Sequence, residues 1–386
     1  MPRYNPILEQ LRTYPQQALE ARKAEVLASG KKLYDFGVGD PIEPTEEWIR
    51  KALCEAVTPH CGYPKVQGTA AFREAVSDYF MRRFQVELDP NRHILPTSGA
   101  KEAVFHAPLL VIDAAAPDRL VGFPDPGYPA YGRGALFAGG EPYPVSLSGD
   151  YVFRPWEIPP EVLRRMRMLW LNSPHNPSGA VMSLDDLQRT YDICQQYDIL
   201  CVSDECYADL YDRDPPHSIL ECGLQNVVAI HSLSKRSGMT GYRAGFMAGD
   251  AEIIGKYRKF RANPGLVPQN FVNAAATVAW QDDEHVAARR EVFRQKKRLF
   301  VDFFDQQGWS TIGRDATLYL WVKAPAGKTG EQWALELLQQ GLVVSPGAMF
   351  ALGDTAKHYI RLAVVPSVED CQQAIDIWRQ AEYQST

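Results

Sequence analysis

The segment from Ser232 to Gly245 contains residues that could form a covalent bond to an aldehyde and hold a phosphate group. It reads Ser-Leu-Ser-Lys-Arg-Ser-Gly-Met-Thr-Gly-Tyr-Arg-Ala-Gly, so that Lys235 lies among hydroxyls and glycines. A lysine amine condenses with a carbonyl to give a Schiff base. Ser232, Ser234 and Arg243 can donate hydrogen bonds to a dianion. The segment predicts covalent catalysis, although a basic loop with turn glycines would explain it when taken alone.

Two further motifs could contact a phosphate and an aromatic ring. The motif Thr-Ser-Gly-Ala-Lys at 97–101 follows an apolar run, and its backbone N–H groups and the Ser98 hydroxyl could bind a phosphate. A capped helix start explains the same residues. The motif Pro-Asp-Pro-Gly-Tyr-Pro at 124–129 also follows an apolar run. Its Tyr128 could stack on a planar ring or only anchor a proline-rich turn.

Three side chains could hold the polar edge of such a ring. Asn176 offers a side-chain donor from a turn, and turns of this composition also form for local reasons. Asp204 ends an apolar run and could either cap a helix or pair with a pyridinium nitrogen. That pairing makes the ring an electron sink for a carbanion at the substrate α-carbon. Tyr207, three residues further on, could donate its phenol to a ring oxygen.

The residues between these motifs predict the sheet that brings them together. Near-continuous apolar strands separated by helices indicate a mostly parallel sheet covered on both faces. Ligands bind at the carboxyl ends of such strands. The predicted strands are 93–96, 120–123, 168–171, 199–202 and 227–230, and the predicted helices between them are 69–84, 101–112 and 183–197.

Both ends of the chain differ from this alternating pattern. Residues 7–29 predict a helix that is broken around Tyr14 and Pro15 and closed by Gly30. Residues 269–307 are largely helix-compatible. A smaller set of elements follows and predicts a second α/β layer: strands at 318–322, 342–344 and 359–364, and helices at 330–340 and 368–381.

Bulk composition narrows the class of protein. The chain has 386 residues, enough for two domains of about 100–200 residues each. The net charge of −6, without long runs of one sign, argues against a nucleic-acid or anionic-membrane surface. No apolar run approaches the roughly 18 residues of a membrane helix, and the N-terminus lacks the apolar run of a signal peptide. Seven cysteines without CxxC spacing argue against a disulfide framework and a zinc site. These features predict a cytoplasmic protein.

Taken in order, the motifs resemble the class I/II aminotransferases, the fold-type I enzymes that use pyridoxal 5′-phosphate. The resemblance covers nearly the whole chain. It implies a large cofactor-binding domain at 46–268 with a mostly parallel seven-stranded sheet. It also implies a smaller α/β domain at 269–386, which includes a long connecting helix and is joined by residues 1–45. The motifs are a glycine turn at 37–41, S-G-A-K at 98–101, P-G-Y-P at 126–129, N-P-S-G at 176–179, D-E-C-Y at 204–207, S-L-S-K at 232–235 and R-L at 361–362.

The resemblance also implies a role for each matching residue, and it implies no metal. Lys235 would carry the cofactor and move a proton, and Asp204 would face the pyridine nitrogen. Asn176 and Tyr207 would bind the ring 3-oxygen, and Tyr128 would stack on the ring. The phosphate would be held by Ser98, Gly99, Ala100, Ser232, Ser234 and Arg243.

The substrate and a second subunit complete the implied site. Arg361 would bind the substrate α-carboxylate, with help from Asn176 and the backbone of Gly39. Tyr63 would reach the phosphate of the neighbouring subunit, which implies a homodimer with shared active sites. Ala100 stands where many relatives have serine or threonine. The missing hydroxyl should weaken cofactor binding by roughly 1.5–3 kcal/mol at most.

The implied reaction moves an amino group between an amino acid and a keto acid. The sequence around Lys235 resembles that of N-succinyldiaminopimelate aminotransferases, which make a lysine precursor with glutamate as the donor. Aspartate, alanine or broad-range aminotransferases and a carbon–sulfur β-lyase are alternatives on the same fold. Decarboxylative synthases match the motifs less well. A non-enzymatic regulator usually carries an N-terminal DNA-binding domain, for which the segment before Phe36 leaves no room.

Overall fold

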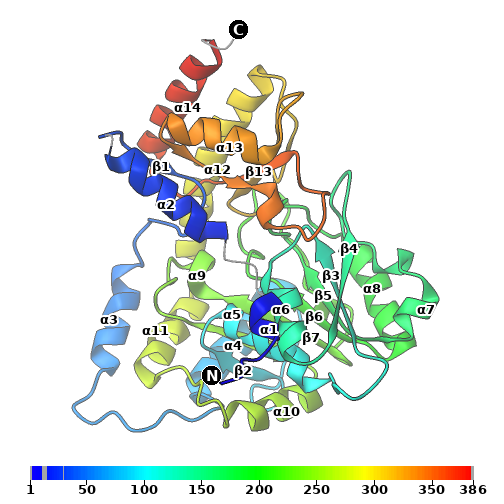
Figure 1. Ribbon diagram of the computed structural model, residues 1–386. Coiled ribbons are helices and arrows are strands. Elements are labelled where there is room, and N and C mark those ends of the chain that lie inside the picture. Colours follow the sequence, from blue (N-terminus) through cyan, green and yellow to red (C-terminus); the bar gives the residue numbers. More distant parts are fainter. Residues whose placement is uncertain (1, 11–14, 29, 384–386) are drawn as a thin grey trace.

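The computed structural model describes residues 2–10, 15–28 and 30–383. Its larger part is built on a seven-stranded sheet (Figure 1). The strands lie in the order β2-β8-β7-β6-β5-β3-β4, and only β8 runs antiparallel to its neighbours. The predicted mostly parallel sheet is therefore confirmed. The strands are β2 (Ile94–Thr97), β3 (Leu120–Asp125), β4 (Glu141–Ser146), β5 (Met166–Asn172), β6 (Leu200–Asp204), β7 (Val227–Ser232) and β8 (Gly245–Gly249).

Helices cover both faces of this sheet, which explains why its central strands are apolar throughout. Along β5, Leu169 and Leu171 pack into one buried cluster, whereas Trp170 packs into another on the opposite face. The covering helices are α3 (Glu47–Ala56), α4 (Ala70–Phe84), α5 (Ala100–His106), α6 (Ala130–Phe137), α7 (Pro160–Leu163), α8 (Leu184–Tyr197), α9 (Leu233–Arg236), α10 (Ala251–Arg261) and α11 (Asn270–Gln281).

Local signals set the helix boundaries where the sequence predicts them. At α8 the Ser183 hydroxyl accepts from the Asp186 N–H, and the Asp186 carboxylate accepts from the Ser183 N–H, which forms a capping box at the start of the helix predicted at 183–197. Thr69 caps α4 by accepting from the Phe72 N–H at 3.2 Å. Gly30 has a φ of +80°, as expected for a glycine that follows a helix.

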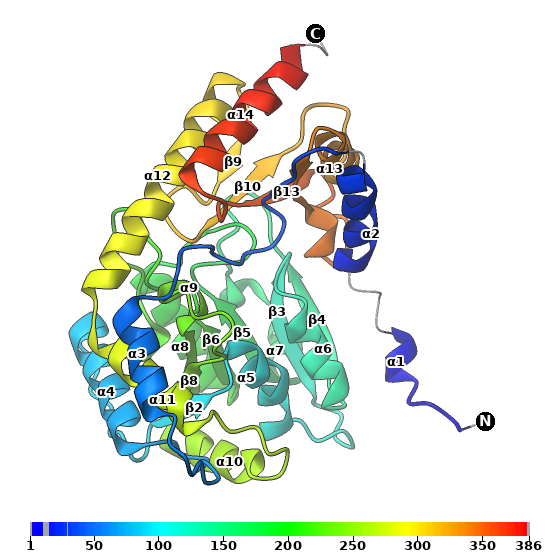
Figure 2. The same cartoon turned by 90° about the vertical axis from the view of Figure 1, so that its left-hand side faces the viewer.

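The smaller part consists of two short sheets and the helices around them. One sheet has the order β12-β13-β10-β9 and is antiparallel, and the other is a parallel pair of β1 and β11. Figure 2 shows α12 running from the larger part to the far end of the smaller one. The elements are α2 (Pro15–Ala28), β1 (Tyr34–Asp35), α12 (Glu284–Gln306), β9 (Thr311–Ile312), β10 (Tyr319–Lys323), α13 (Gly330–Gln339), β11 (Leu342–Val343), β12 (Ser345–Pro346), β13 (Tyr359–Ala363) and α14 (Val368–Tyr383). The short helix α1 (Ile7–Gln10) lies apart from these elements in Figure 2.

Some elements differ from the sequence-based expectation. The helical stretch at 269–307 is interrupted between α11 and α12, where Asp282 has an extended backbone and accepts a hydrogen bond from the His285 N–H at 3.0 Å. The sequence did not predict the strands β4 and β8. The predicted break at Tyr14 lies outside the described residues. Within the described part of the chain, no helix is long and apolar enough to cross a membrane.

Candidate active site

A cavity of about 330 Å³ lies where the carboxyl ends of the parallel strands meet the smaller part. Most of the predicted site residues line it together, although they come from widely separated parts of the chain. They are Gly39, Ala100, Tyr128, Asn176, Asp204, Tyr207, Ser232, Ser234, Lys235, Arg243 and Arg361.

Asp204 is a buried carboxylate at the end of β6. It is only 6% exposed, and burial raises its pKa above the usual value. The Tyr131 hydroxyl donates to it at 2.8 Å, and the Cys206 N–H donates at 3.3 Å. Among the described residues no ion pair with Asp204 is found. Because a buried charge needs a counter-charge, a ligand with a protonated ring nitrogen fits this carboxylate.

Tyr131 is a site residue that the sequence analysis missed. It is fully buried on α6, and its ring stacks on Trp170 with centroids 4.7 Å apart. This packing fixes the hydroxyl that faces Asp204. A tyrosine inside a helix is usually an ordinary core residue, so the only available signal was its position one turn after Tyr128.

Removing the Tyr131 hydroxyl should slow the chemistry predicted for this cavity without unfolding the protein. The hydrogen bond favours the charged form of Asp204, so Tyr131→Phe should raise the pKa of that carboxyl further. We expect kcat/KM to fall roughly tenfold, with its acidic limb moved to higher pH. The pH–rate profile measures both effects. As a control, Tyr34→Phe removes a hydroxyl that donates to Gln373 at 2.9 Å. An equal change in both variants would contradict a role through Asp204.

Lys235 lies directly after β7, in the short helix α9. The Ser232 hydroxyl accepts from the Ser234 N–H at 3.1 Å and so caps the turn that carries the lysine. The Lys235 ammonium donates to the Gly39 carbonyl. A side chain on Gly39 would overlap the Tyr319 hydroxyl, so glycine is required where this backbone approaches the site.

Arg243 and its neighbours form a set of donors suited to a phosphate. Arg243 has a φ of +56°, an uncommon conformation for a residue other than glycine. A Cβ on Gly99 would lie 2.6 Å from the Arg243 guanidinium, so that only glycine allows this approach. Ser232 and Ser234 line the same cavity. Ser98 lines an adjoining groove with Arg243 and does not line the main cavity, and Gly99 lines neither of them.

Arg361 lies on the opposite side of the cavity, on β13. Its guanidinium donates to Asn176 Oδ1 at 2.9 Å and to the Gly37 carbonyl at 2.8 Å. It lies over the rings of Tyr319 and Phe350, 4.2 and 4.5 Å from their centroids. Its buried Nε has no partner among the described residues. A guanidinium held in this way and left with a donor suits a carboxylate ligand.

The two predicted ligands of the ring oxygen also have defined partners. The Oδ1 atom of Asn176 is taken by Arg361, so its Nδ2 group is the donor that it offers to a ligand. The Tyr207 hydroxyl lies 3.0 Å from the Tyr319 hydroxyl. Burial raises the pKa of Tyr207 well above the usual value, so the phenol stays protonated and can donate.

Tyr63 is a predicted site residue that lines neither the main cavity nor the groove that contains Ser98. Its side chain is fully exposed, and it lines a separate surface groove with Cys61 and Phe271. The structure of a single chain therefore does not bring Tyr63 together with the other site residues.

Pyridoxal phosphate fits the residues that are present. Asp204 offers an unpaired buried carboxylate for the ring nitrogen, Arg243 and the two serines offer donors for a dianion, and Lys235 offers an amine for the aldehyde. These side chains already line the cavity, so the cofactor could bind them without a change in the fold.

Comparison with known proteins agrees with this chemistry. Residues 30–377 match the family described as "Aminotransferase class I and II". The LL-diaminopimelate aminotransferase of Aquifex aeolicus is 34% identical over 378 residues, which covers 96% of both chains. An aminotransferase structure from Neisseria meningitidis has a TM-score of 0.90 at 30% identity, over 98% of this chain and 100% of that chain.

A second solved structure is similar over nearly the same length. It is named as a probable N-succinyldiaminopimelate aminotransferase from Thermus thermophilus, with a TM-score of 0.88 and 26% identity, over 95% of this chain and 99% of that chain. The match to the family and the coverage of its members are both nearly complete. The chain therefore belongs to the class I and II aminotransferases, enzymes that use pyridoxal phosphate to move an amino group between an amino acid and a keto acid.

Proposed function

We propose that the cavity transfers an amino group between glutamate and a keto acid of the diaminopimelate type, in lysine biosynthesis. The observation that carries the proposal is the presence of Lys235, Asp204 and Arg361 around one cavity. An amine, a counter-ion for a ring nitrogen and a carboxylate ligand are the groups that amino transfer to an α-amino acid requires.

The protein residues bind, orient and move a proton. When bound, pyridoxal phosphate supplies the electron sink that stabilises negative charge at the substrate α-carbon. Lys235 would hold the cofactor by its aldehyde carbon and, when its amine is free, would move the proton to and from the substrate α-carbon. Asp204 keeps its charge beside the ring nitrogen, with Tyr131 fixing its orientation. Arg361 orients the α-carboxylate. Holding these groups in place supplies proximity and orientation.

The substrate is the finer part of the proposal. The relative from Aquifex aeolicus is named for LL-diaminopimelate, and the Thermus thermophilus protein is named for its N-succinyl derivative. Both names describe long amino acids with a distal polar group. We keep the N-succinyl compound as the first candidate and test LL-diaminopimelate beside it. Aspartate and alanine remain the shorter alternatives.

Single half-reactions test the function directly. The holoenzyme is mixed with one amino acid at a time, and the spectral change from the aldehyde to the amine form of the cofactor is followed. We expect glutamate and one diaminopimelate compound to react, and a response to neither would overturn the proposal. Incubation with cystathionine tests the β-lyase alternative, because release of pyruvate and ammonia without a keto acceptor would favour that reaction.

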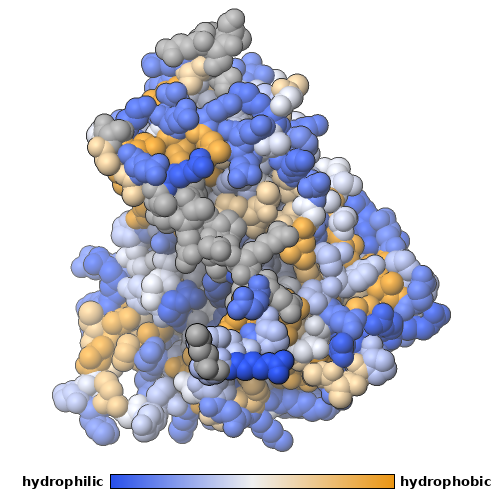
Figure 3. Space-filling model, in the orientation of Figure 1, coloured by the Kyte–Doolittle hydropathy of each residue, from blue (hydrophilic) through white to orange (hydrophobic). Residues whose placement is uncertain are grey.

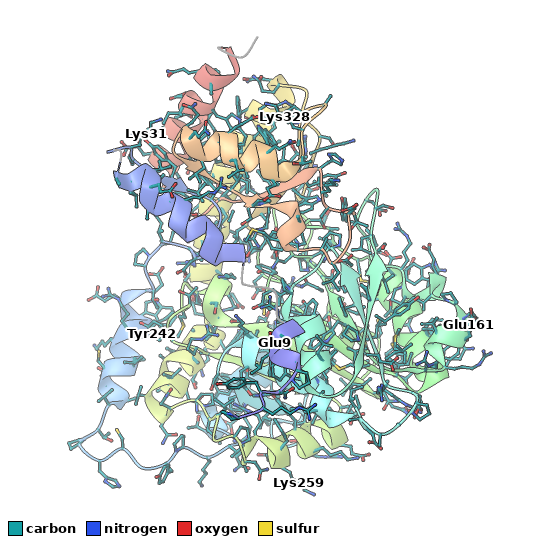
Figure 4. The ribbon with its side chains drawn as sticks, viewed as in Figure 1. Glu9, Lys31, Glu161, Tyr242, Lys259 and Lys328 are labelled. Atoms are coloured by element: carbon teal, nitrogen blue, oxygen red, sulfur yellow. The ribbon has the colours of Figure 1, made fainter. Side chains whose placement is uncertain are left out.

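We also propose that two chains form a homodimer and complete each other's sites. Trp48 and Val57 expose apolar surface on and beside α3, where Figure 3 shows an apolar area. A groove lined by Leu53, Tyr242 and Phe271 leads from this face to Arg243. Figure 4 shows Tyr242 beside α3 and α11. The exposed Tyr63 lies at the same face and would reach the partner's phosphate site.

Mixing Lys235→Ala chains, which we expect to be inactive, with Tyr63→Phe chains, which we expect to be impaired, should raise activity if the sites are shared. A heterodimer of Lys235→Ala and Tyr63→Phe chains contains one site with both native residues, provided that Tyr63 acts across the interface. We expect activity to recover to about half that of the native dimer. Sedimentation of each variant checks that the dimer forms. No recovery in confirmed heterodimers would contradict sharing.

The domain division is a proposal of the same kind. We propose an N-terminal segment at 1–45 that joins the smaller domain, a cofactor domain at 46–268 and a smaller domain at 269–386. The pairing of β1 with β11 supports the first boundary. Helix α11 belongs to the proposed smaller domain by its place in the sequence, but it packs on α3 and α4 of the larger part, so this helix lies across the second boundary.

A further inference from the structure

Tyr319 is a cavity residue of the smaller part that the sequence analysis missed. It is the first residue of β10, it is buried, and it lines the main cavity. Its hydroxyl lies 3.0 Å from the Tyr207 hydroxyl, and the two rings meet edge to face with centroids 5.4 Å apart. The same hydroxyl lies against Gly39, where a Cβ would overlap it. A hydroxyl from the smaller part therefore lies inside the site, beside the phenol predicted to bind the ring oxygen.

The backbone also connects Tyr319 to Tyr207. The Leu210 N–H donates to the Tyr207 carbonyl at 2.9 Å, and the Thr317 N–H donates to the Leu210 carbonyl at 2.8 Å. The Thr317 hydroxyl then accepts from the Tyr319 N–H at 3.0 Å. Thr317 has a φ of +60°, a conformation that is rare for a β-branched residue. Three hydrogen bonds in series therefore join the two tyrosines, in addition to the contact between their hydroxyls.

A buried lysine holds the segment that precedes Tyr319. The Lys297 ammonium donates to the carbonyls of Arg314 and Ala316 at 2.8 and 3.2 Å. It also lies 3.2 Å from the Asp212 carboxylate of the larger part. A buried ammonium that lost these partners would carry a large desolvation cost, so the segment is held in place. Tyr319 is therefore presented to the cavity by a well-anchored stretch of chain.

The ring of Tyr319 contacts a second functional group of the site. Its centroid lies 4.2 Å from the Arg361 guanidinium. The two residues lie on neighbouring antiparallel strands, where Tyr319 pairs with Ala363 and Trp321 pairs with Arg361. Tyr319 therefore touches two residues with different proposed roles, Tyr207 at the ring oxygen and Arg361 at the substrate α-carboxylate.

One arrangement of the two hydroxyl protons suits a ligand of Tyr207. A phenol has a single proton to donate, so Tyr207 can donate to a ring oxygen only if Tyr319 donates the hydrogen bond between the two phenols. Both bonds then run in the same direction, and consecutive hydrogen bonds of this kind strengthen each other. The Tyr319 hydroxyl should therefore make Tyr207 a stronger donor.

We propose that Tyr319 is a positioning residue, whose hydroxyl strengthens the hydrogen bond from Tyr207 to the ring 3-oxygen and whose ring holds Arg361 for the α-carboxylate. This inference rests on the proposed function and adds the residue that connects its two binding groups. The hydroxyl and the ring act on different partners, so two substitutions separate them. Tyr319→Phe removes the hydroxyl alone, whereas Tyr319→Leu also removes the ring.

The visible absorbance of lysine-bound pyridoxal phosphate tests the hydroxyl. This absorbance changes with pH as the bound cofactor loses a proton, and a hydrogen bond to the ring 3-oxygen favours the deprotonated form. We expect Tyr319→Phe to raise the pH midpoint by roughly 0.5–1 unit, the effect of one hydrogen bond, and Tyr207→Phe to raise it further. The double variant should match Tyr207→Phe, because Tyr319 acts through Tyr207. Tyr34→Phe, a buried tyrosine elsewhere in the smaller part, is the matched control and should keep the native midpoint.

Half-reactions with glutamate test the ring. Tyr319→Phe should lower the limiting rate severalfold and leave the saturation constant for glutamate unchanged, because the ring that contacts Arg361 remains. Tyr319→Leu should also raise the saturation constant roughly fivefold, the effect of losing one cation–π contact. A general loss of packing would change both quantities in both variants. Far-ultraviolet circular dichroism checks that each variant is folded.

The outcomes separate this inference from the proposed function. A native midpoint in Tyr319→Phe, together with a raised midpoint in Tyr207→Phe, overturns the role of Tyr319 alone. Shifts that add in the double variant also overturn it, since the two hydroxyls would then act independently. A native midpoint in Tyr207→Phe overturns the role proposed for Tyr207, and no reaction of the native enzyme with any amino acid overturns the proposed function.

Discussion

Lys235→Ala is expected to abolish amino transfer and the visible absorbance of lysine-bound pyridoxal phosphate. The lysine is the amine that we propose for holding the aldehyde and moving the α-proton, and among the described residues it lines the cavity together with Asp204, Ser232 and one further lysine, Lys101. We expect kcat to fall by roughly 10⁴- to 10⁶-fold, the range found when a catalytic nucleophile is removed. Absorbance spectra and steady-state rates measure the two effects.

The control for this variant is a lysine outside the site. Lys259 is exposed on α10 (Figure 4), so Lys259→Ala should keep the native spectrum and rate. Far-ultraviolet circular dichroism should show both variants folded. A native-like visible band in Lys235→Ala would mean that the aldehyde is held elsewhere, and the proposed role of Lys235 would then be wrong.

Asp209→Ala should cause the largest loss of stability. The buried Asp209 carboxylate accepts from Arg236 at 2.8 Å, from Arg83 at 3.2 Å and from Tyr79 at 3.0 Å. Arg236 directly follows Lys235, so this cluster also holds the turn behind the site. Removing the carboxylate leaves two arginines without their buried counter-charge. We expect the free energy of unfolding, measured by urea denaturation, to fall by about 3–5 kcal/mol.

The stabilisation that Asp209 provides should decrease as the pH falls into the acidic range. Burial alone would raise its pKa, but the charges of Arg236 and Arg83 hold the pKa below its usual value. A depressed pKa stabilises the fold above the unfolded pKa of about 3.9, and that contribution is lost as the pH falls through the folded value. The difference between native and variant protein should therefore be constant near neutral pH and shrink in acid.

An exposed ion pair provides the comparison. Asp305 pairs with Arg314 at the surface, with side chains 51% and 39% exposed. Asp305→Ala should lower the free energy of unfolding far less than Asp209→Ala, because water screens the exposed pair. If Asp209→Ala and Asp305→Ala lowered the free energy of unfolding equally, the stabilising role proposed for the buried Asp209 carboxylate would be wrong.

Much of the sheet and many of the cavity residues could be predicted from the sequence, because each strand and its following motif are short continuous segments of the chain. An apolar run followed by a polar motif marks a strand and its carboxyl end, and parallel strands bring those ends together. Asn172 and Asp204 lie opposite each other in the β5–β6 register for this reason. The capping box at Ser183 is equally local.

The features that the sequence did not predict depend on contacts between distant segments. Tyr131 looks like a core aromatic residue until α6 packs beside β6 and places its hydroxyl next to Asp204. Tyr319 lies beside Tyr207 only because its segment bonds to the residues that follow β6, and the two segments are far apart in the chain. The direction of β8 could not be predicted, because five residues bounded by glycines carry no signal for antiparallel pairing.

The reversed direction of β8 has a consequence for how the cofactor stays in place. Ser232 pairs with Gly245 across β7 and β8, and the Leu233 N–H donates to the Ala244 carbonyl at 3.1 Å. The loop that contains Lys235 and Arg243 therefore begins and ends at the same end of two neighbouring strands, β7 and β8, which are hydrogen-bonded to each other. If the smaller part moves relative to the sheet, Arg361 moves with it. The distance between Lys235, which we propose to bind the aldehyde, and Arg243, which we propose to bind the phosphate, should stay the same.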